Sequence, residues 1–136
     1  MHTIKNQITI NLNGTIIHKP PHSPGRRNDY AILKIKHPVL SEELMVFYDL
    51  GYLGVKKDFP EQISIVPYKR KKGKQLTVSQ KEWNKLQSKI RIKVEHAICK
   101  IKKFRINAET FRNKLCRYDM VSDIVCGIVN FKIKWK

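Results

Sequence analysis

The longest run of the chain without glycine or proline contains the stretch from Thr77 to Phe104, and this stretch constrains the fold most strongly. Thr77 and Ser79 are both candidate N-caps. Gln80 or Glu82, three residues further on, would complete a capping box. Apolar residues then recur at steps of three and four: Trp83, Leu86, Ile90, Val94, Ala97, Ile101 and Phe104. The pattern predicts one helix over residues 77–104 with a single apolar face.

A second stripe of the same helix carries one acid among many bases. Glu95 is the only carboxylate in the last two-thirds of the stretch, in a stripe that also contains Ser88, Arg91 and Lys102. The surrounding bases are Lys85, Lys89, Arg91, Lys93, Lys100, Lys102 and Lys103. A lone acid beside a buried face in a field of bases suggests a metal ligand next to a polyanion. The alternative, which the spacing alone favours, is a salt bridge from Glu95 to Arg91 on a solvated helix.

The charge of the whole chain supports a polyanionic partner. Lysine and arginine number 28 and aspartate and glutamate 11, which gives a formal net charge of +17 over 136 residues. Such an excess argues against a typical enzyme of small neutral metabolites and points to nucleic acid or an anionic surface. A membrane is the weaker option, because no apolar run approaches the length of a span and no signal-peptide pattern is present. Three cysteines without a CxxC pair predict reduced thiols in a cytosolic protein.

The rest of the chain predicts short strands and helices in one α/β domain. Asn13-Gly14 lies between β-branched runs, so we expect a β-hairpin over residues 3–21, ended by Pro20, Pro21 and Pro24-Gly25. The further elements expected are a helix from Asn28 or Asp29 through Ile35, strands over 45–48 and 63–66, and a short helix over 107–114. Residues 121–131 are apolar enough for a packing helix or a strand, and we favour a helix capped by Ser122 or Asp119. The resulting order is β-β-α-β-β-α-α-α, with the C-terminal helices over residues 108–133.

Asp49 stands at the end of a predicted strand, so that the acid-bearing strand covers residues 45–49. It opens onto the glycine-rich turn Leu50-Gly51-Tyr52-Leu53-Gly54. The carboxyl end of a strand, next to such a turn, is where α/β folds place reactive groups. The alternative, favoured without further support, is a turn aspartate that satisfies its own backbone.

A basic loop separates the last predicted strand from the long helix. Five of its six residues are bases, namely Lys69, Arg70, Lys71, Lys72 and Lys74. A solvated loop is the simplest interpretation, but this position is well suited to gripping phosphates. We therefore expect this basic loop, residues 69–74, to bind the phosphate backbone of DNA.

Four blocks of sequence, in this order, are typical of one protein family. They are SPGRRNDYAIL, FYDLGYLG, RIKVEHAICKIKKFRI, and TFRNKL followed by DIVCGIVNF. With these blocks the chain resembles the DDE-class insertion-sequence transposases over nearly its whole length. Arg91, Glu95 and Lys102 keep the spacing Arg-x3-Glu-x6-Lys of that family. Ser88 stands where the family has Tyr, and Asn28 stands where it has His.

The resemblance implies a fold and a chemistry. The fold would be ribonuclease-H-like, a mixed sheet with flanking helices. Asp49 would be the second and Glu95 the third of three acids that hold Mg²⁺ or Mn²⁺, hard cations that prefer carboxylate oxygens. The family uses these ions to cleave and transfer DNA strands at the ends of the element and at its target. Arg91 and Lys102 would hold phosphates beside the scissile bond.

The first of the three acids has no obvious counterpart here. In the family it lies on a central strand ahead of the hairpin, and no other Asp of this chain replaces it. We therefore expect a truncated or split transposase domain without its first strand, inactive alone unless an upstream polypeptide supplies that acid. Whether it is an enzyme stays open, because a non-enzymatic basic DNA-binding fragment or a translated transposase remnant is the alternative. An RNA-binding protein ranks last, and the oligomeric state is not predicted.

Overall fold

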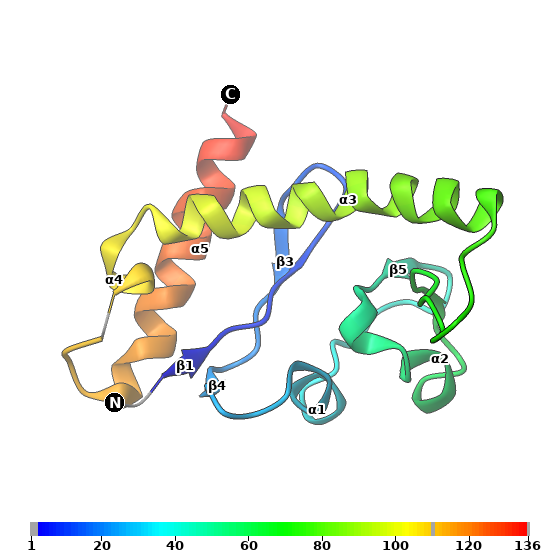
Figure 1. Ribbon diagram of the computed structural model, residues 1–136. Helices are drawn as coiled ribbons and strands as arrows, with labels where there is room; N and C mark the ends of the chain where they lie inside the picture. The colour runs from blue at the N-terminus through cyan, green and yellow to red at the C-terminus, as the bar shows by residue number, and fades with distance from the viewer. Residues whose placement is uncertain (1–2, 110, 136) are drawn as a thin grey trace. The chain divides into compact units, whose positions relative to one another are not determined.

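The computed structural model describes residues 3–109 and 111–135, and the chain divides into two compact units (Figure 1). Unit 1 contains the residues up to Asn28 and those from Lys93 onward, whereas unit 2 covers Asp29–Ile92. Both units mix helices with short strands, so the predicted α/β class is confirmed.

A β-hairpin lies at the start of unit 1, as predicted. Strand β2 (Thr9–Ile10) pairs with β3 (Ile16–His18) in antiparallel register. Gly14 turns the chain with φ 83°, a conformation that glycine adopts without steric cost. The side chain of Asn11 closes the turn, because its Oδ1 accepts hydrogen bonds at 3.0 Å from the backbone N–H groups of Asn13 and Thr15.

The hairpin ends at His18, before Pro20 and Pro21, as predicted, but a second strand pairing that the sequence did not predict includes Pro24. Strand β1 (Ile4–Lys5) pairs with β4 (Ser23–Pro24). Proline has no N–H group, but it is tolerated on an edge strand where it needs only to accept. The next donor, the N–H of Gly25, bonds to the carbonyl of Thr3 at 2.8 Å and extends the pairing by one residue.

The core of unit 1 forms between the hairpin, the end of α3 (Val78–Lys102) and α5 (Tyr118–Lys134). Its buried members are Ile16, Ile101, Val125, Cys126 and Val129. The side chain of Asn130 fixes the hairpin to α5, because it accepts from the N–H of Ile16 and donates to its carbonyl, both at 2.8 Å.

The predicted C-terminal helix is confirmed, but its predicted caps are wrong. The N-cap of α5 is Arg117, so Asp119 and Ser122 both lie inside the helix. Asp119 instead accepts hydrogen bonds from the backbone N–H of His22 at 2.8 Å and from its ring at 2.9 Å. Ser122 is buried at 1% exposure. Asp119 therefore binds a residue distant in the sequence, His22, and does not cap the helix as the sequence predicted.

The segment before α5 is less helical than predicted. Helix α4 (Arg105–Ala108) covers only the start of the expected 107–114 helix, and a 3₁₀ turn, η2 (Leu115–Arg117), follows. The C-cap of α4 is Glu109, whose backbone is extended with ψ 175°. Phe111 then packs edge-on against Tyr118 with ring centroids 5.1 Å apart, and Thr110 lies outside the described residues.

Unit 2 begins with the predicted helix, α1 (Asp29–Ile35). Strands β5 (Met45–Phe47) and β6 (Ile63–Ile65) confirm the two predicted short strands, and they pair in parallel. Between them lie two elements that the sequence did not predict, the 3₁₀ turn η1 (Leu50–Tyr52) and the helix α2 (Val55–Asp58). Val55 is fully buried, which anchors α2.

Helix α3 begins with the predicted capping box and is the long helix of Figure 1. The hydroxyl of Thr77 accepts from the N–H of Gln80 at 3.3 Å, and the side chain of Gln80 accepts from the N–H of Thr77 at 3.1 Å. The predicted apolar face is buried only near the C-terminal end, because Trp83 and Leu86 are 41% and 56% exposed whereas Ala97 is 1% exposed.

The strands of residues 3–109 and 111–135 form three separate two-stranded pairings, and these do not join into one mixed sheet. The ribonuclease-H-like arrangement therefore stays a prediction. In the same residues, no helix has the length and apolar character needed to cross a membrane. Cys99, Cys116 and Cys126 are free thiols in the structure.

Candidate DNA-binding and catalytic site

Asp49 lies on an exposed turn directly beyond the parallel strand pair. The pairing of β5 with β6 continues to Tyr48, whose N–H donates to the carbonyl of Ile65 at 2.8 Å. Asp49 then caps η1, because its Oδ1 accepts from the N–H of Leu50 at 2.8 Å. The aspartate thus makes the turn contact that a structural role predicts, and it also presents a half-exposed carboxylate at the end of a strand.

Arg91 of α3 reaches this carboxylate. Its Nη1 lies 3.3 Å from Oδ1 of Asp49, and the two side chains are 56% and 49% exposed. Such an exposed ion pair contributes at most about 1 kcal/mol and weakens with salt. The structure therefore brings two of the predicted site residues, Asp49 and Arg91, into contact, and this contact is weak.

A network of polar side chains lies at the end of strand β5, next to Asp49. Gln62, 9% exposed, accepts through Oε1 from the hydroxyl of Tyr48 at 2.9 Å and lies 3.2 Å from Nε2 of His37. The ring of His37 stacks on Phe59 with centroids 3.8 Å apart. Burial raises the pKa of Tyr48, which keeps its hydroxyl protonated as the donor. Sequence reasoning missed Gln62, and no local pattern marks it.

Two of the four family-like blocks meet in unit 2. Tyr30, from the block RRNDYAIL, donates its hydroxyl to Asp58, which also pairs with Lys34 at 3.1 Å. A Cβ at Gly54, the last glycine of DLGYLG, would lie only 2.7 Å from the hydroxyl oxygen of Tyr30. Tyr52 of the same block meets the ring of Tyr30 edge-on at 6.3 Å. This glycine therefore lets α1 pack closely beside the turn that carries the acid.

Glu95 and Lys102 both lie on α3 in unit 1, and both are exposed. Arg91 and Glu95 are four residues apart on one helix, so they project from neighbouring turns. Lys102 is the last residue of the helix, where a cation complements the helix dipole.

The carboxylates suit a hard divalent cation only in part. Asp49 and Glu95 are exposed oxygen donors of the kind that Mg²⁺ and Mn²⁺ prefer. Among residues 3–109 and 111–135, however, no group of three or more His, Cys, Asp or Glu side chains is placed to hold a metal. Each carboxylate by itself has the donor chemistry of a ligand for such a cation.

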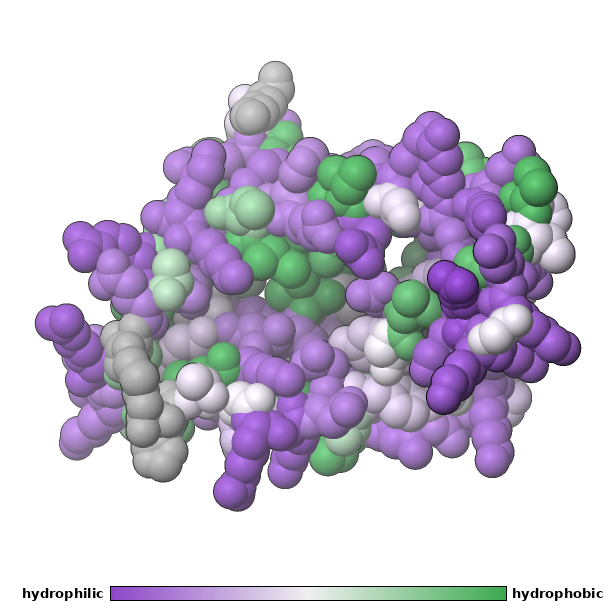
Figure 2. Space-filling model, viewed as in Figure 1, coloured by the Kyte–Doolittle hydropathy of each residue, from purple (hydrophilic) through white to green (hydrophobic). Residues whose placement is uncertain are grey.

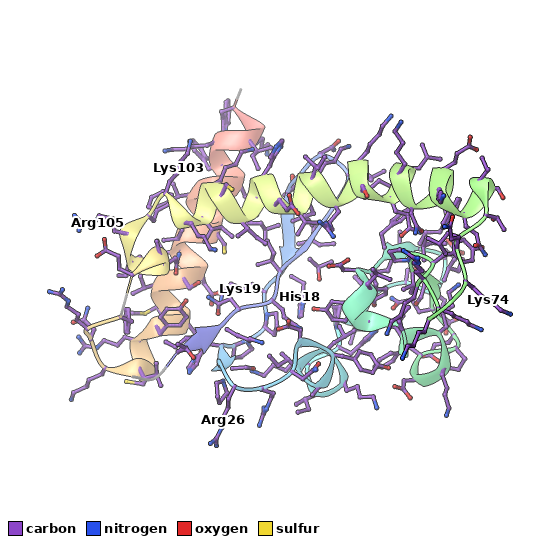
Figure 3. The ribbon with its side chains drawn as sticks, in the orientation of Figure 1. His18, Lys19, Arg26, Lys74, Lys103 and Arg105 are labelled. Atoms are coloured by element: carbon purple, nitrogen blue, oxygen red, sulfur yellow. The ribbon has the colours of Figure 1, made fainter. Side chains whose placement is uncertain are left out.

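The basic loop is fully exposed and is held at its base. Lys74, labelled in Figure 3, lies where this loop leads into α3. Gly73 turns the loop with φ 77°, and the N–H of Lys74 donates to the carbonyl of Lys71 at 3.1 Å. The side chain of Asn84 on α3 makes two hydrogen bonds to the backbone of Tyr68. It accepts from the N–H of Tyr68 at 2.9 Å and donates to the carbonyl of Tyr68 at 3.0 Å. The sequence did not predict this role of Asn84, because the residues around it in the helix form no pattern that marks it.

The face of the molecule shown in Figure 2 is predominantly hydrophilic, as expected for a chain with 28 lysines and arginines. The bases of the basic loop, Lys69, Arg70, Lys71, Lys72 and Lys74, are all exposed. Repulsion among them favours a polyanionic partner that neutralises several charges at once.

Comparison with known proteins identifies the class. The sequence profile of the DDE superfamily endonucleases matches residues 1–130, so the chain belongs to that family, whose members generally depend on divalent metal ions. A relative is the probable transposase for insertion sequence element IS702 of Microchaete diplosiphon, 35% identical over 135 residues. This match covers 99% of the chain and 48% of the relative, so the chain spans about half the length of that relative. The resemblance to DDE-class insertion-sequence transposases is thereby confirmed, and no solved structure matches.

Proposed function

We propose that this chain forms part of the catalytic domain of a DDE transposase and supplies two of its three metal-binding acids. Asp49 is the second acid and Glu95 the third. The observation that carries the proposal is the exposed turn beyond β5, where the carboxylate of Asp49 lies 3.3 Å from the guanidinium of Arg91 on the helix that bears Glu95. Acid and base from separate family-like blocks thus meet at the end of a parallel strand pair.

The residues of the chain have separate roles in this proposal. The bound Mg²⁺ or Mn²⁺ would activate a water or a 3′-hydroxyl group and stabilise the leaving oxygen. Arg91 and Lys102 bind phosphates beside the scissile bond, because guanidinium and ammonium groups are the usual partners of phosphate oxygens. The basic loop binds the DNA backbone further away, at the ends of the element or at its target, without reading sequence.

The third carboxylate comes from outside these 136 residues, on the same polypeptide or on another. Two cations beside a phosphate need more negative charge than two carboxylates provide, so the 136 residues alone bind metal weakly and cleave little or no DNA. The support for this statement is that Arg91, Glu95 and Lys102 keep the family spacing, whereas no aspartate of this chain stands at the place of the family's first acid.

A cleavage assay on the 136-residue chain tests this division of labour. We expect the chain to bind duplex DNA and to leave a supercoiled plasmid intact in Mg²⁺ or Mn²⁺. Metal-dependent nicking that Glu95→Gln abolishes and Glu61→Gln spares would show that the chain already holds a complete site. Glu61 is a suitable control because it is an exposed acid of unit 2 away from both family spacings.

The second candidate is a non-enzymatic DNA-binding protein. It is favoured by the engagement of Asp49 in a helix cap and an ion pair, two contacts that a purely structural aspartate would also make. Both candidates bind DNA, so affinity does not separate them. Affinity for metal does separate them, because Asp49→Asn and Glu95→Gln should each weaken metal binding only if both acids are metal ligands.

A further inference from the structure

A small open hollow lies between the basic loop and the start of α3, within unit 2. We call it the loop hollow. Its lining residues are Arg70, Gln75, Leu76 and Lys81. Two of the four are cations, Gln75 contributes an amide, and none of the four is an acid. Two positive charges that line one small space repel each other, so an anion between them is favoured. The loop hollow therefore has the chemistry of an anion-binding site.

A turn within the basic loop forms one side of the loop hollow. The N–H of Lys74, which is labelled in Figure 3, donates to the carbonyl of Lys71 at 3.1 Å. Gly73 lies inside this turn with φ 77°, a conformation that costs glycine little. The turn reverses the chain between Arg70 and Gln75, and both of these residues line the hollow. The lining residues of the loop are therefore brought together by a defined turn.

The contact between Asn84 and Tyr68 joins the loop to the other side of the hollow. Its two hydrogen bonds, at 2.9 and 3.0 Å, fix the backbone just before the loop to α3. Arg70 comes two residues after Tyr68, and Lys81 comes three residues, about one helical turn, before Asn84. This contact therefore brings the two cations, one from the loop and one from the helix, to the same hollow.

The size of the loop hollow suits one phosphate group. Its volume is about 190 Å³. Liquid water occupies about 30 Å³ per molecule, so the hollow has room for roughly six water molecules. A phosphate group fits this space, whereas a nucleotide with its sugar and base does not. An internal phosphate of DNA would have to bring a sugar on each side, so the hollow suits a phosphate at the end of a strand better.

The charge of the loop hollow favours the same group. A terminal phosphate is a monoester with a charge of about −1.5 to −2 at pH 7, whereas an internal phosphodiester carries a single negative charge. Arg70 and Lys81 together supply two positive charges. The guanidinium group of arginine can bind two phosphate oxygens side by side, and the ammonium group of lysine adds a point charge. We propose that the loop hollow binds the 5′-phosphate end of a DNA strand.

This proposal rests on the proposed function, because strand cleavage creates such an end. Water adds to the phosphorus, the bond from phosphorus to the 3′-oxygen breaks, and one proton of the water passes to that oxygen. The phosphate stays on the 5′ end of the other product and releases its remaining water proton near neutral pH. The loop hollow then keeps the phosphate-bearing product bound after cleavage.

Binding of two duplexes that differ in one group tests the proposal. The duplexes have the same sequence, and one strand ends in a 5′-phosphate or in a 5′-hydroxyl group. Fluorescence anisotropy without divalent metal, at moderate salt, gives the ratio of the two dissociation constants. We expect the unmodified chain to bind the phosphate end at least about fivefold more tightly. Arg70→Ala and Lys81→Ala should each bring this ratio close to one, and circular dichroism should show that both variants, at exposed positions, stay folded.

Two matched variants separate the loop hollow from general attraction to DNA. Lys72→Ala removes a charge from the same loop and Lys85→Ala removes one from the same helix, and neither residue lines the hollow. Both variants should weaken binding of the two duplexes alike and keep the ratio. Equal affinity of the unmodified chain for the two duplexes would overturn the proposal. A ratio that falls as much in these variants as in Arg70→Ala would overturn it as well.

The outcome is separable from that of the proposed function, because the assay contains no divalent metal. Equal binding of the two duplexes, with Mn²⁺ binding at Asp49 and Glu95 intact, would refute the phosphate site alone. A preference for the phosphate end without metal binding at these acids would refute the proposed function alone. Failure to bind either duplex would count against both.

Discussion

Asn84 offers a test of how the fold prepares the basic loop for DNA. Its side chain makes two hydrogen bonds to the backbone of Tyr68, at 2.9 and 3.0 Å, immediately before the loop begins. Asn84→Ala removes both bonds and leaves every charge of the loop in place. The loop should then lose order but not charge.

The size of the effect follows from these two bonds. Each contributes a net of about 0.5–1.5 kcal/mol, and because they lie at the exposed surface the low end applies, so their sum is about 1–2 kcal/mol. If all of this becomes a cost of reordering the loop on DNA, the dissociation constant rises by about five- to thirtyfold. The number of phosphates neutralised is unchanged, so the dependence of affinity on salt should keep its slope.

Fluorescence anisotropy with a labelled duplex over a series of salt concentrations measures both quantities. We expect Asn84→Ala to shift the line of log affinity against log salt without changing its slope. Lys71→Ala should instead reduce the slope by about one. Asn113→Ala, at an exposed asparagine of unit 1, should change neither. A slope that falls with Asn84→Ala, or an affinity that does not respond to it, would refute the idea that Asn84 orders the loop.

Three further predictions concern stability. Asn130→Ala should lower the free energy of unfolding by about 2–4 kcal/mol in urea titrations, because it leaves the N–H and carbonyl of Ile16 unpaired; a loss below about 1 kcal/mol would contradict this. Gly54→Ala should cost about 1–3 kcal/mol in the same assay through its clash with Tyr30, and Tyr30→Leu should relieve most of that cost; equal stability of Gly54→Ala and the unmodified chain would be inconsistent with this packing. Burial raises the pKa of Asp119, but the hydrogen bonds from His22 outweigh it and hold that pKa below 3.8, so this residue stabilises the fold above about pH 4 and the stabilisation is lost as pH falls through the lowered pKa. Asp119→Asn should flatten this acid-side loss in melts recorded against pH, and an unchanged profile would show that Asp119 does not cause it.

The elements that the sequence predicted well are those with complete local signals. Thr77 and Gln80 specify a helix start through a reciprocal pair of hydrogen bonds within one turn. Gly14 specifies a hairpin turn through its own backbone freedom. The acid-bearing strand was predicted from its apolar run; it ends at Phe47, two residues earlier than predicted, and Asp49 caps the turn that follows.

The features that were missed depend on contacts between distant residues. Pro24 pairs in a strand because its partner, Ile4, lies twenty residues earlier in the chain. Asp119 is not a cap because His22 supplies better donors. Gln62 reads as an ordinary surface residue until the fold buries it beneath Tyr48. The proposed acids were identified from their spacing in family-like blocks, and their roles stay predictions.

Paramagnetic broadening by Mn²⁺ in nuclear magnetic resonance spectra tests the central claim most directly. If Asp49 and Glu95 bind one cation, substoichiometric Mn²⁺ should broaden the amide signals of both Leu50 and His96, the residues that follow them in the chain. Asp49→Asn and Glu95→Gln should each abolish the broadening at both positions, whereas Glu61→Gln should leave it intact. Broadening that leaves these two signals unaffected, or that survives both substitutions, would contradict the assignment of Asp49 and Glu95 as metal ligands.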